Sequence, residues 1–351
     1  MSRLTCCRRI PRTLWALAGT FCLLGGAALP SATADVRVAP GLRIEEVATG
    51  IPRPIQLAFD ATGTLVVLSH GWRGDAAAEI YRLDLTGSLP VDASRAPRVV
   101  IPFAEGPRKT VFGSFAIDPR SGDLFLGEEN GNRIYRLTAD RRLTPFAVGL
   151  QHLVGGGSLV FDGKGRLVVL DFASAEGQLR SETPPPPALD WLTTEAYHGP
   201  LVFRVDPEED IPRPRRLDLV APLFPKASAK RAVREFLPRF ISVATSPADE
   251  LLLLDSLGEV FRLTSEAGLE LLARLPAGHY HRTHIVVAPD GGVFVSSGFH
   301  IRQVFRISPA RVVTSVAREL GDPAGIVVDR AANLYIAETA LHRIIRVSPS
   351  P

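Results

Sequence analysis

Short apolar runs separated by tight turns follow one another along most of the chain. Six pairs of such runs share one plan, namely LAFDATGTLVVL (57–68), FAIDPRSGDLFLG (115–127), LVFDGKGRLVVLD (159–171), VATSPADELLLLD (243–255), IVVAPDGGVFVSS (285–297) and IVVDRAANLYIAE (326–338). Runs nearly continuous in Val, Leu, Ile and Phe predict strands covered on both faces. The breaks, rich in Gly, Pro, Asp and Asn, predict tight hairpins.

A third strand with a central arginine follows each pair. These strands read IYRL, IYRL, VFRV, VFRL, VFRI and IIRV, and their arginines are Arg82, Arg136, Arg204, Arg262, Arg306 and Arg346. Segments such as TPFAVGL (144–150) and LELLARL (269–275) supply a fourth strand. Four strands in each repeated unit predict the blade of a propeller. We expect the six arginines to bridge neighbouring blades.

The two ends of the chain complement each other. The last unit stops at RIIRVSPSP (343–351) without a fourth strand, whereas VRVAPGLRIEEVATG (36–50) offers one unpaired strand before the first unit. If that strand completes the last blade, the ring closes and no sheet edge stays exposed. The sequence therefore predicts an all-β, six-bladed β-propeller of four-stranded antiparallel blades, forming a single domain over residues 35–351.

The first 34 residues predict a secretory signal peptide. MSRLTCCRRIPR carries four arginines and no acid, a short apolar stretch follows, and small residues stand at Ala32 and Ala34. This order is typical of a signal cleaved after Ala34. We therefore expect a periplasmic or secreted protein with no membrane span after cleavage.

Removing that segment changes the charge and the cysteine content. Cys6, Cys7 and Cys22 all lie within it, so the mature chain has no disulfide and no thiolate metal site. It keeps 36 basic residues, 40 less the four arginines, against 37 acidic ones. This balance removes the electrostatic argument for binding nucleic acid.

All eight histidines fall in loops that share one face of such a fold. His152, His279, His281 and His284 lie in loops that lead into an inner strand, and His70, His198, His300 and His342 lie between second and third strands. The long insertions belong to the same face, and one elaborated face usually marks a binding surface.

Polar residues open most of the inner strands. The six positions are Gln56, Ser114, Ser158, Ser242, His284 and Gly325. They line a water-filled axial channel, or they form a polar pocket floor in which His284 acts as the catalytic general base. Further candidate ligand contacts are Trp72, Glu129, Asn130, His152, His281 and Arg282.

The segment HYHRTH (279–284) resembles a metal motif at first sight. In an extended segment His279 and His281 point the same way and His284 the opposite way, so the three would not share one metal. We predict no metal site here. The acids that end second strands, Glu128, Asp171, Asp255 and Glu338, are expected to hold their own loops.

Two segments carry a resemblance to known families. DPAGIVVDRAANLYIAETALHRIIRVSP (322–349) resembles NHL repeats, and APGLRIEEVATGIPRPIQLAFDATGTLVVL (39–68) is similar to the start of sugar and sorbosone dehydrogenases that carry pyrroloquinoline quinone. Gluconolactonase-like propellers are also similar, which implies a metal held by Asn or Asp just before the inner-strand openings. Here those positions hold Ile55, Gly113, Gly157, Ile241, Thr283 and Ala324.

We interpret the chain as an extracytoplasmic NHL-type propeller, monomeric, that binds a small molecule, a glycan or a protein at its loop-rich face and polar channel mouth. The alternative is a quinone-dependent sugar dehydrogenase-like oxidoreductase, favoured by His152 ahead of a glycine-rich segment. A lactonase-like hydrolase is disfavoured by the missing metal ligands. The residues by themselves name no cofactor.

Overall fold

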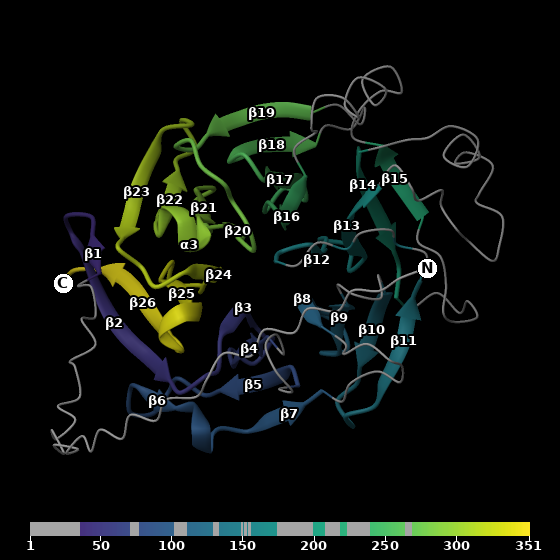
Figure 1. Cartoon of the computed structure of the whole chain (residues 1–351), viewed down its shortest axis with the longest axis horizontal. Coiled ribbons are helices and arrows are strands. Elements are labelled where there is room, and N and C mark those ends of the chain that lie inside the picture. Colours follow the sequence, from purple (N-terminus) through teal and green to yellow (C-terminus); the bar gives the residue numbers. More distant parts are fainter. Residues whose placement is uncertain are drawn as a thin grey trace, which may run out of the picture. The chain divides into compact units, whose positions relative to one another are not determined.

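Six small antiparallel sheets are arranged as the blades of a six-bladed β-propeller, as the sequence predicts (Figure 1). The computed structural model describes residues 36–70, 77–101, 111–128, 133–148, 150, 153, 156–173, 199–207, 218–222, 239–263 and 269–351. They belong to one compact unit, Asp35–Pro351. Among these described residues, no helix is long and apolar enough to span a membrane.

Each blade runs from an inner strand at the axis to an outer strand. Blade 1 is β3 (Pro54–Phe59), β4 (Leu65–Ser69), β5 (Glu79–Leu83) and β7 (Arg98–Val100); blade 2 is β8 (Phe112–Ile117), β9 (Leu124–Glu128), β10 (Arg133–Leu137) and β11 (Leu143–Ala147); blade 3 is β12 (Leu159–Phe161), β13 (Leu167–Ala173), β14 (Gly199–Val205) and β15 (Asp218–Pro222).

The second half repeats the plan with added edge strands. Blade 4 is β16 (Phe240–Thr245), β17 (Leu251–Asp255), β18 (Glu259–Leu263) and β19 (Leu269–Arg274); blade 5 is β20 (Ile285–Val287), β21 (Val293–Ser296), β22 (Val304–Ile307) and β23 (Val313–Arg318), with β1 (Arg37–Val38) at its edge; blade 6 is β24 (Pro323–Val328), β25 (Leu334–Glu338), β26 (Arg343–Pro349) and β2 (Leu42–Thr49), with β6 (Val91–Asp92) at its edge. Within the described ranges, the helices are single turns: α3 (Gly298–Ile301), η1 (Ala93–Arg95) and η3 (Thr339–Leu341).

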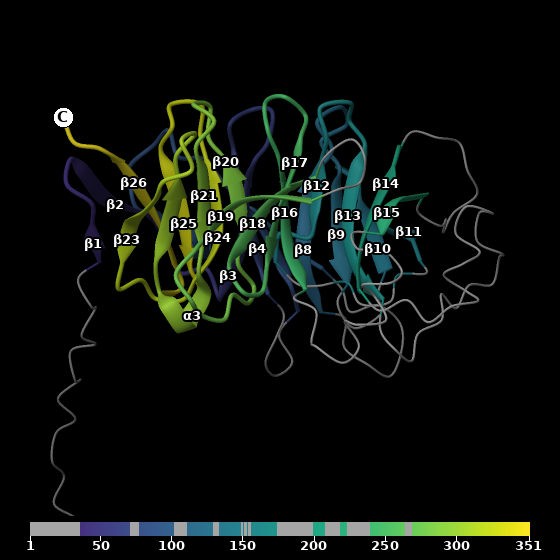
Figure 2. The same ribbon diagram turned by 90° about the horizontal axis from the view of Figure 1, so that it is seen from above.

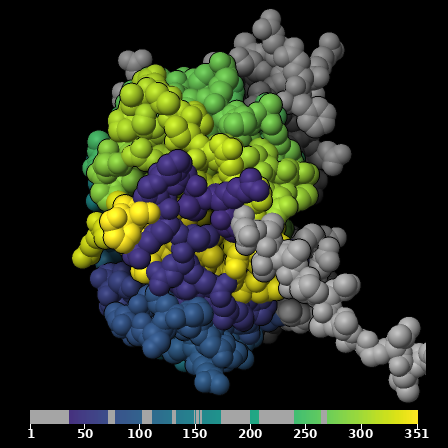
Figure 3. Space-filling view, turned by 90° about the vertical axis from the view of Figure 1, so that its left-hand side faces the viewer, coloured from purple at the N-terminus to yellow at the C-terminus, as the bar shows by residue number. Residues whose placement is uncertain are grey.

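The N-terminal strand closes the ring. β2 pairs antiparallel with β26, from Leu42 opposite Pro349 to Thr49 opposite Arg343. Figure 3 shows the N-terminal segment lying against the last strand of the chain. An ion pair between Arg346 and Glu45 supports this ladder. The predicted closure is therefore confirmed.

The first hairpin of a blade is set by a side chain at its turn. In blade 1, Asp60 Oδ1 accepts hydrogen bonds from the backbone N–H groups of Thr62 and Thr64, both at 3.0 Å. Asp162 and Asp329 do the same in blades 3 and 6. Because such a side chain replaces a backbone partner, Asp at this position favours the turn.

None of the six repeated arginines pairs directly with an acid of a neighbouring blade, so the expectation that they bridge blades is wrong. Each one pairs with an acid of its own blade, as Arg82 does with Asp60 at 2.9 Å and Arg306 with Asp290 at 2.5 Å. The remaining pairs are Arg136–Asp123, Arg204–Asp162, Arg262–Glu250 and Arg346–Glu45. The third strand lies beside the first hairpin of its own sheet, which brings the guanidinium to the acid there.

The hydrophobic core lies between the blades. Each of six apolar clusters joins two neighbouring sheets. Between blades 2 and 3, for example, the Phe125 ring meets Phe146 at 4.7 Å and Phe161 at 5.5 Å between centroids. Both faces of a blade are therefore buried, which explains the nearly continuous apolar runs.

Candidate functional site

One face of the propeller carries the loops into the inner strands and the loops between second and third strands. We call it the histidine face, because the six described histidines lie there: His70, His279, His281, His284, His300 and His342. The opposite face carries the hairpin turns, and we call it the turn face. In the edge-on view, α3 marks the histidine face (Figure 2). His152 and His198 lie outside the described residues.

The polar residues that open the inner strands tie neighbouring blades together. The Gln56 amide donates to Phe115 O and accepts from Phe115 N, both at 2.6 Å, which joins blades 1 and 2. Ser158 Oγ donates to Ser114 Oγ at 3.0 Å, and Ser242 Oγ accepts from Ile285 N at 3.1 Å. All four polar side chains are buried. The hydrogen bonds of these side chains therefore connect neighbouring blades.

Local irregularities in the inner strands place these side chains. The ladders of β3, β8 and β16 with their neighbours shift register immediately before Gln56, Ser114 and Ser242. A bulge re-aims the side chain that follows it and is common next to functional sites. At the corresponding point of blade 6, a Cβ on Gly325 would lie 2.6 Å from Gln56 Cα. Glycine there allows blades 6 and 1 to approach closely.

His284 lies in the axial region and reaches past blade 4. A Cβ built on Gly157 of blade 3 would stand 3.2 Å from its Nδ1 and 2.0 Å from Ser242 Oγ. The backbone of His284 is fixed by Ser296, whose Oγ accepts from His284 N at 2.8 Å. Burial lowers the pKa of His284 to about 3, so the imidazole is neutral at pH 7. Within the described part of the chain, its Nε2 has no hydrogen-bond partner.

Four charged or titratable residues gather on the histidine face, where blades 5, 6 and 1 meet. This axial cluster consists of Arg53, His70, Arg282 and Asp322. Burial, together with the charges of Arg282 and Arg53, lowers the pKa of His70 to about 3. Burial raises the pKa of Asp322, against the opposing effect of the same two arginines. The charges of Arg53 and Arg282 therefore act on both His70 and Asp322.

The backbone of the axial cluster is held in an uncommon conformation. Arg53, Arg282 and Asp322 have φ values of 49°, 54° and 60°, each just before an inner strand. A non-glycine residue in this region costs about 1–3 kcal/mol, and such residues gather at functional sites. Backbone hydrogen bonds support the arrangement: His70 N donates to Arg53 O at 3.3 Å, and Thr339 N donates to Asp322 O at 3.1 Å.

Three further histidines form a rim beside this cluster. The rings of His279 and His281 are stacked at 6.0 Å, and His279 meets His300 edge-on at 5.7 Å. His279 and His281 thus lie on the same side of the segment, as the alternation predicts, while His284 is buried. Burial and the nearby Arg282 lower the pKa of His281. No group of three or more His, Asp or Glu side chains suited to a metal ion occurs among the described residues.

Of the acids that end second strands, Asp255 holds its own loop as expected, whereas Glu338 also holds a different loop. Asp255 Oδ1 accepts from Leu257 N at 2.9 Å and Glu259 N at 2.8 Å. Burial raises the pKa of Asp255 to about 6. Glu338 accepts from Gly321 N at 2.7 Å and from Arg343 Nε at 2.6 Å, so it fixes the loop between blades 5 and 6.

The predicted site residues separate into three groups. His281 and Arg282 lie at the rim and in the axial cluster, whereas Gln56, Ser114, Ser158, Ser242 and His284 are buried beneath. Trp72, Glu129, Asn130 and His152 lie outside the described residues. Sequence reasoning missed Arg53 and Asp322. Their signal is a charged residue repeated just before an inner strand, in IPRP, HRTH and GDPAG.

Comparison with known proteins shows the fold alone. No protein-family model matches the chain, and no curated protein matches it in sequence. Among solved structures, a gluconolactonase from Xanthomonas campestris is 18% identical, with a TM-score of 0.54 over 90% of this chain and 91% of that one.

Two other structures have the same architecture. Virginiamycin B lyase from Staphylococcus aureus is 11% identical, with a TM-score of 0.54 over 88% of this chain and all of that one. A glucose dehydrogenase-like oxidoreductase from Thermus thermophilus is 16% identical, with a TM-score of 0.53 over 88% of this chain and all of that one. The neighbours are lactonase, lyase and dehydrogenase propellers. The shared feature is the propeller.

Proposed function

We propose that this chain is an exported binding module that takes a small carboxylate between Arg53 and Arg282 on the histidine face. The observation that carries the proposal is the convergence of Arg53 and Arg282, each in a left-handed conformation just before an inner strand, on the same two groups, His70 and Asp322. Guanidinium groups pair with carboxylates in strong, charge-assisted hydrogen bonds. With His70 neutral, two guanidiniums face the single carboxylate of Asp322, and the remaining positive charge suits a ligand carboxylate.

The state of His284 favours binding over proton transfer. A general base is most effective when its pKa lies near the working pH. With a pKa of about 3, the buried imidazole of His284 is a weak proton acceptor at pH 7. We therefore give His284 a supporting role beneath the axial cluster.

Gluconate and glucose, a sugar acid and its parent sugar, test the proposal. Gluconate carries a carboxylate where glucose does not, so titration calorimetry should detect gluconate binding and much weaker glucose binding. Arg53→Gln and Arg282→Gln should each weaken gluconate binding about tenfold, since each removes a charge-assisted hydrogen bond. The matched control is Arg330→Gln, an exposed arginine on the turn face. Equal binding of gluconate and glucose contradicts the proposal, and so does an equal loss of gluconate binding in Arg330→Gln.

A quinone-dependent oxidoreductase is the second candidate. Pyrroloquinoline quinone is itself a polycarboxylate, so Arg53 and Arg282 would suit it as well. When bound, it would supply a two-electron acceptor for alcohol oxidation. Sugar-dependent dye reduction by purified protein with added quinone, lost in Arg282→Gln, would favour this candidate over simple binding.

Export is part of the proposal and has its own test. The arginine-rich, apolar and small-residue order of residues 1–34 supports it. When the full chain is expressed in a host that secretes by this route, the protein should be recovered outside the cytoplasm with its N-terminus at Asp35. Recovery of the uncut chain in the cytoplasm would contradict it.

A further inference from the structure

Two blades carry the same turn with an arginine at the same place. Arg141 lies between β10 and β11 in blade 2, and Arg311 lies between β22 and β23 in blade 5. Their φ values are 65° and 64°. Each backbone N–H donates to the carbonyl three residues earlier, Thr138 O at 2.9 Å and Ser308 O at 2.8 Å. The two turns are therefore structurally equivalent.

Arg311 has an acidic partner on the preceding blade. Its Nη2 donates to Glu270 Oε1 at 2.5 Å, and Glu270 belongs to the outer strand β19 of blade 4. Glu270 also accepts from Arg262 Nε at 3.0 Å. One carboxylate thus bridges the strand arginine of blade 4 and the turn arginine of blade 5, across the seam between the two blades.

At the seam between blades 1 and 2, a proline stands where that glutamate would be. Arg262 lies opposite Glu270 in its ladder. In blade 1, Tyr81 pairs with Arg98, and Arg82 N donates to Pro97 O at 3.1 Å, so Pro97 lies opposite Arg82.

The missing glutamate affects the two arginines of this seam differently. Arg82 keeps its bond to Asp60, as Arg262 keeps its bond to Glu250. The guanidinium of Arg141 has no hydrogen bond or ion pair with any described residue. No carboxylate of a described residue therefore bridges Arg82 and Arg141 at this seam.

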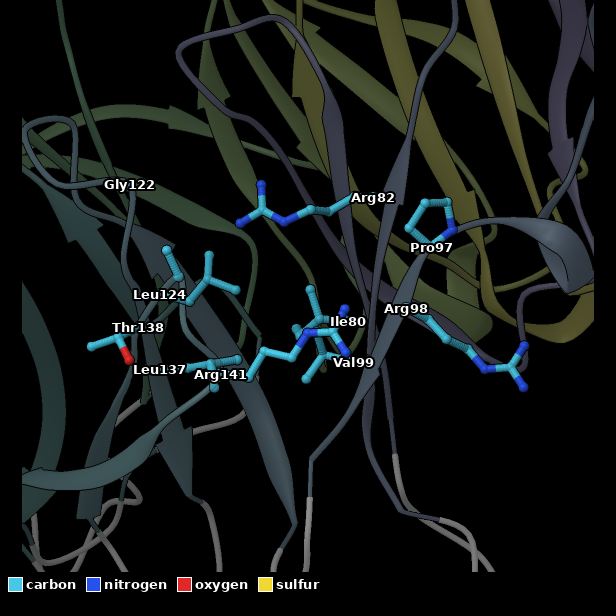
Figure 4. Close-up of a pocket in the computed structure, with 11 residues that line it drawn as sticks. Ile80, Arg82, Pro97, Arg98, Val99, Gly122, Leu124, Leu137, Thr138 and Arg141 are labelled. Carbon is cyan, nitrogen blue, oxygen red and sulfur yellow. The ribbon is translucent and has the colours of Figure 1, made fainter.

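A pocket of about 160 Å³ opens at this place (Figure 4). Its floor is apolar and its rim cationic. Ile80, Val99, Leu124 and Leu137 form the floor, with Arg82, Pro97 and Arg141 around it. In Figure 4 the Arg141 side chain extends over the floor, while Arg98 points away from it. A cavity of about 150 Å³ accommodates a benzene ring, so the pocket suits about six carbon atoms.

We propose that this seam pocket binds an aliphatic carboxylate of about six carbons. Its carboxylate takes the position that Glu270 fills at the other seam and bridges Arg82 and Arg141. Its alkyl chain covers the apolar floor. The site lies on the turn face, so it is separate from the proposed carboxylate site between Arg53 and Arg282.

Hexanoate is the probe, and titration calorimetry with the full chain is the measurement. Saturable binding of hexanoate is expected, with hexan-1-ol and hexylamine at least about tenfold weaker, because each lacks the charge that the arginines pair with. Arg141→Gln should weaken hexanoate binding about tenfold. The matched control is Arg142→Gln, which removes the adjacent exposed arginine that does not line the pocket.

A gain-of-partner variant gives the sharper test. Pro97→Glu restores the acid of the other seam and should abolish hexanoate binding while raising the melting temperature, whereas Pro97→Gln should not raise it. Arg282→Gln should leave hexanoate binding unchanged. Undiminished binding in a folded Pro97→Glu variant overturns the inference, as do equal losses in Arg141→Gln and Arg142→Gln. Loss in Arg282→Gln would place the bound hexanoate on the histidine face instead.

Discussion

Gln56 of blade 1 binds Phe115 of blade 2 through both ends of its amide, with Nε2 donating to Phe115 O and Oε1 accepting from Phe115 N at 2.6 Å. β8 is the innermost strand of its sheet, so these two backbone groups face the axis with no further strand to pair with. The side chain takes the place of a neighbouring strand. It therefore joins two blades.

This relationship predicts a stability role for Gln56. Gln56→Leu removes both hydrogen bonds and leaves a buried N–H and a buried C=O without partners, so the free energy of unfolding should fall by about 2–4 kcal/mol. Urea denaturation followed by circular dichroism measures the change. A variant of unchanged stability that only loses ligand binding would show that Gln56 serves the ligand instead.

The close approach of blades 6 and 1 predicts a cost for any side chain at position 325. Gly325→Ala would place Cβ 2.6 Å from Gln56 Cα and 2.8 Å from Ile55 O, both backbone atoms. Because backbone cannot rotate aside, the variant should lose about 1–3 kcal/mol of stability. Gly87→Ala is the control, because a Cβ there meets nothing within 4 Å. Equal melting temperatures for the two variants would rule out the crowding.

His284 predicts a loss of stability in acid. Its pKa is about 3 in the folded chain, against an ordinary value of 6.5, so the unfolded chain binds more protons between these pH values. Stability should therefore fall as the pH drops from 6.5 towards 3. His284→Asn removes this titration, and its free energy of unfolding should depend less steeply on pH in that window. Parallel pH profiles for both proteins would contradict the assignment.

Asp255 predicts the opposite trend in part of the same window. Its pKa is about 6, against an ordinary 3.8, so the folded chain binds more protons between pH 3.8 and 6. Its contribution is present below pH 3.8 and is lost as the pH rises through 6. Asp255→Asn keeps an oxygen that can accept from Leu257 and Glu259. The difference in stability between this variant and the parent should depend on pH in that window; a constant difference would exclude the shift.

Because β2 closes the ring, we predict that removing residues from the N-terminus lowers stability sharply only once β2 itself is removed. A chain that begins at Gly41 loses β1 but keeps the ladder to β26, and should stay folded. A chain that begins at Gly50 also loses Val47, which is fully buried, and leaves the β26 edge unpaired. Burying one valine is worth about 1.5–3 kcal/mol, so the second truncation should lower stability by at least that amount. Scanning calorimetry of the two truncations decides between them.

Local, repeated patterns in the amino-acid sequence are enough to specify the fold. The blades are specified by six hairpin patterns and six arginine strands, without knowledge of any contact. Their closure is specified by the extra strand at the start of the propeller and the missing fourth strand at its end. The face on which the histidines lie follows from the same strand order. The expectation for the repeated arginines failed, since both a same-blade and a neighbouring-blade acid agree with the spacing, and only the strand geometry distinguishes them.

Tertiary contacts, by contrast, determine which polar groups form hydrogen bonds between blades and which gather into a site. Gln56 and Ser242 look alike in sequence as polar strand openings, but their bonds to the next blade depend on bulges and on the packing of separate sheets. Arg53, Arg282 and Asp322 come together from three blades through left-handed residues that no local pattern specifies. Such convergence depends on how the ring closes, and closure is a property of the whole chain.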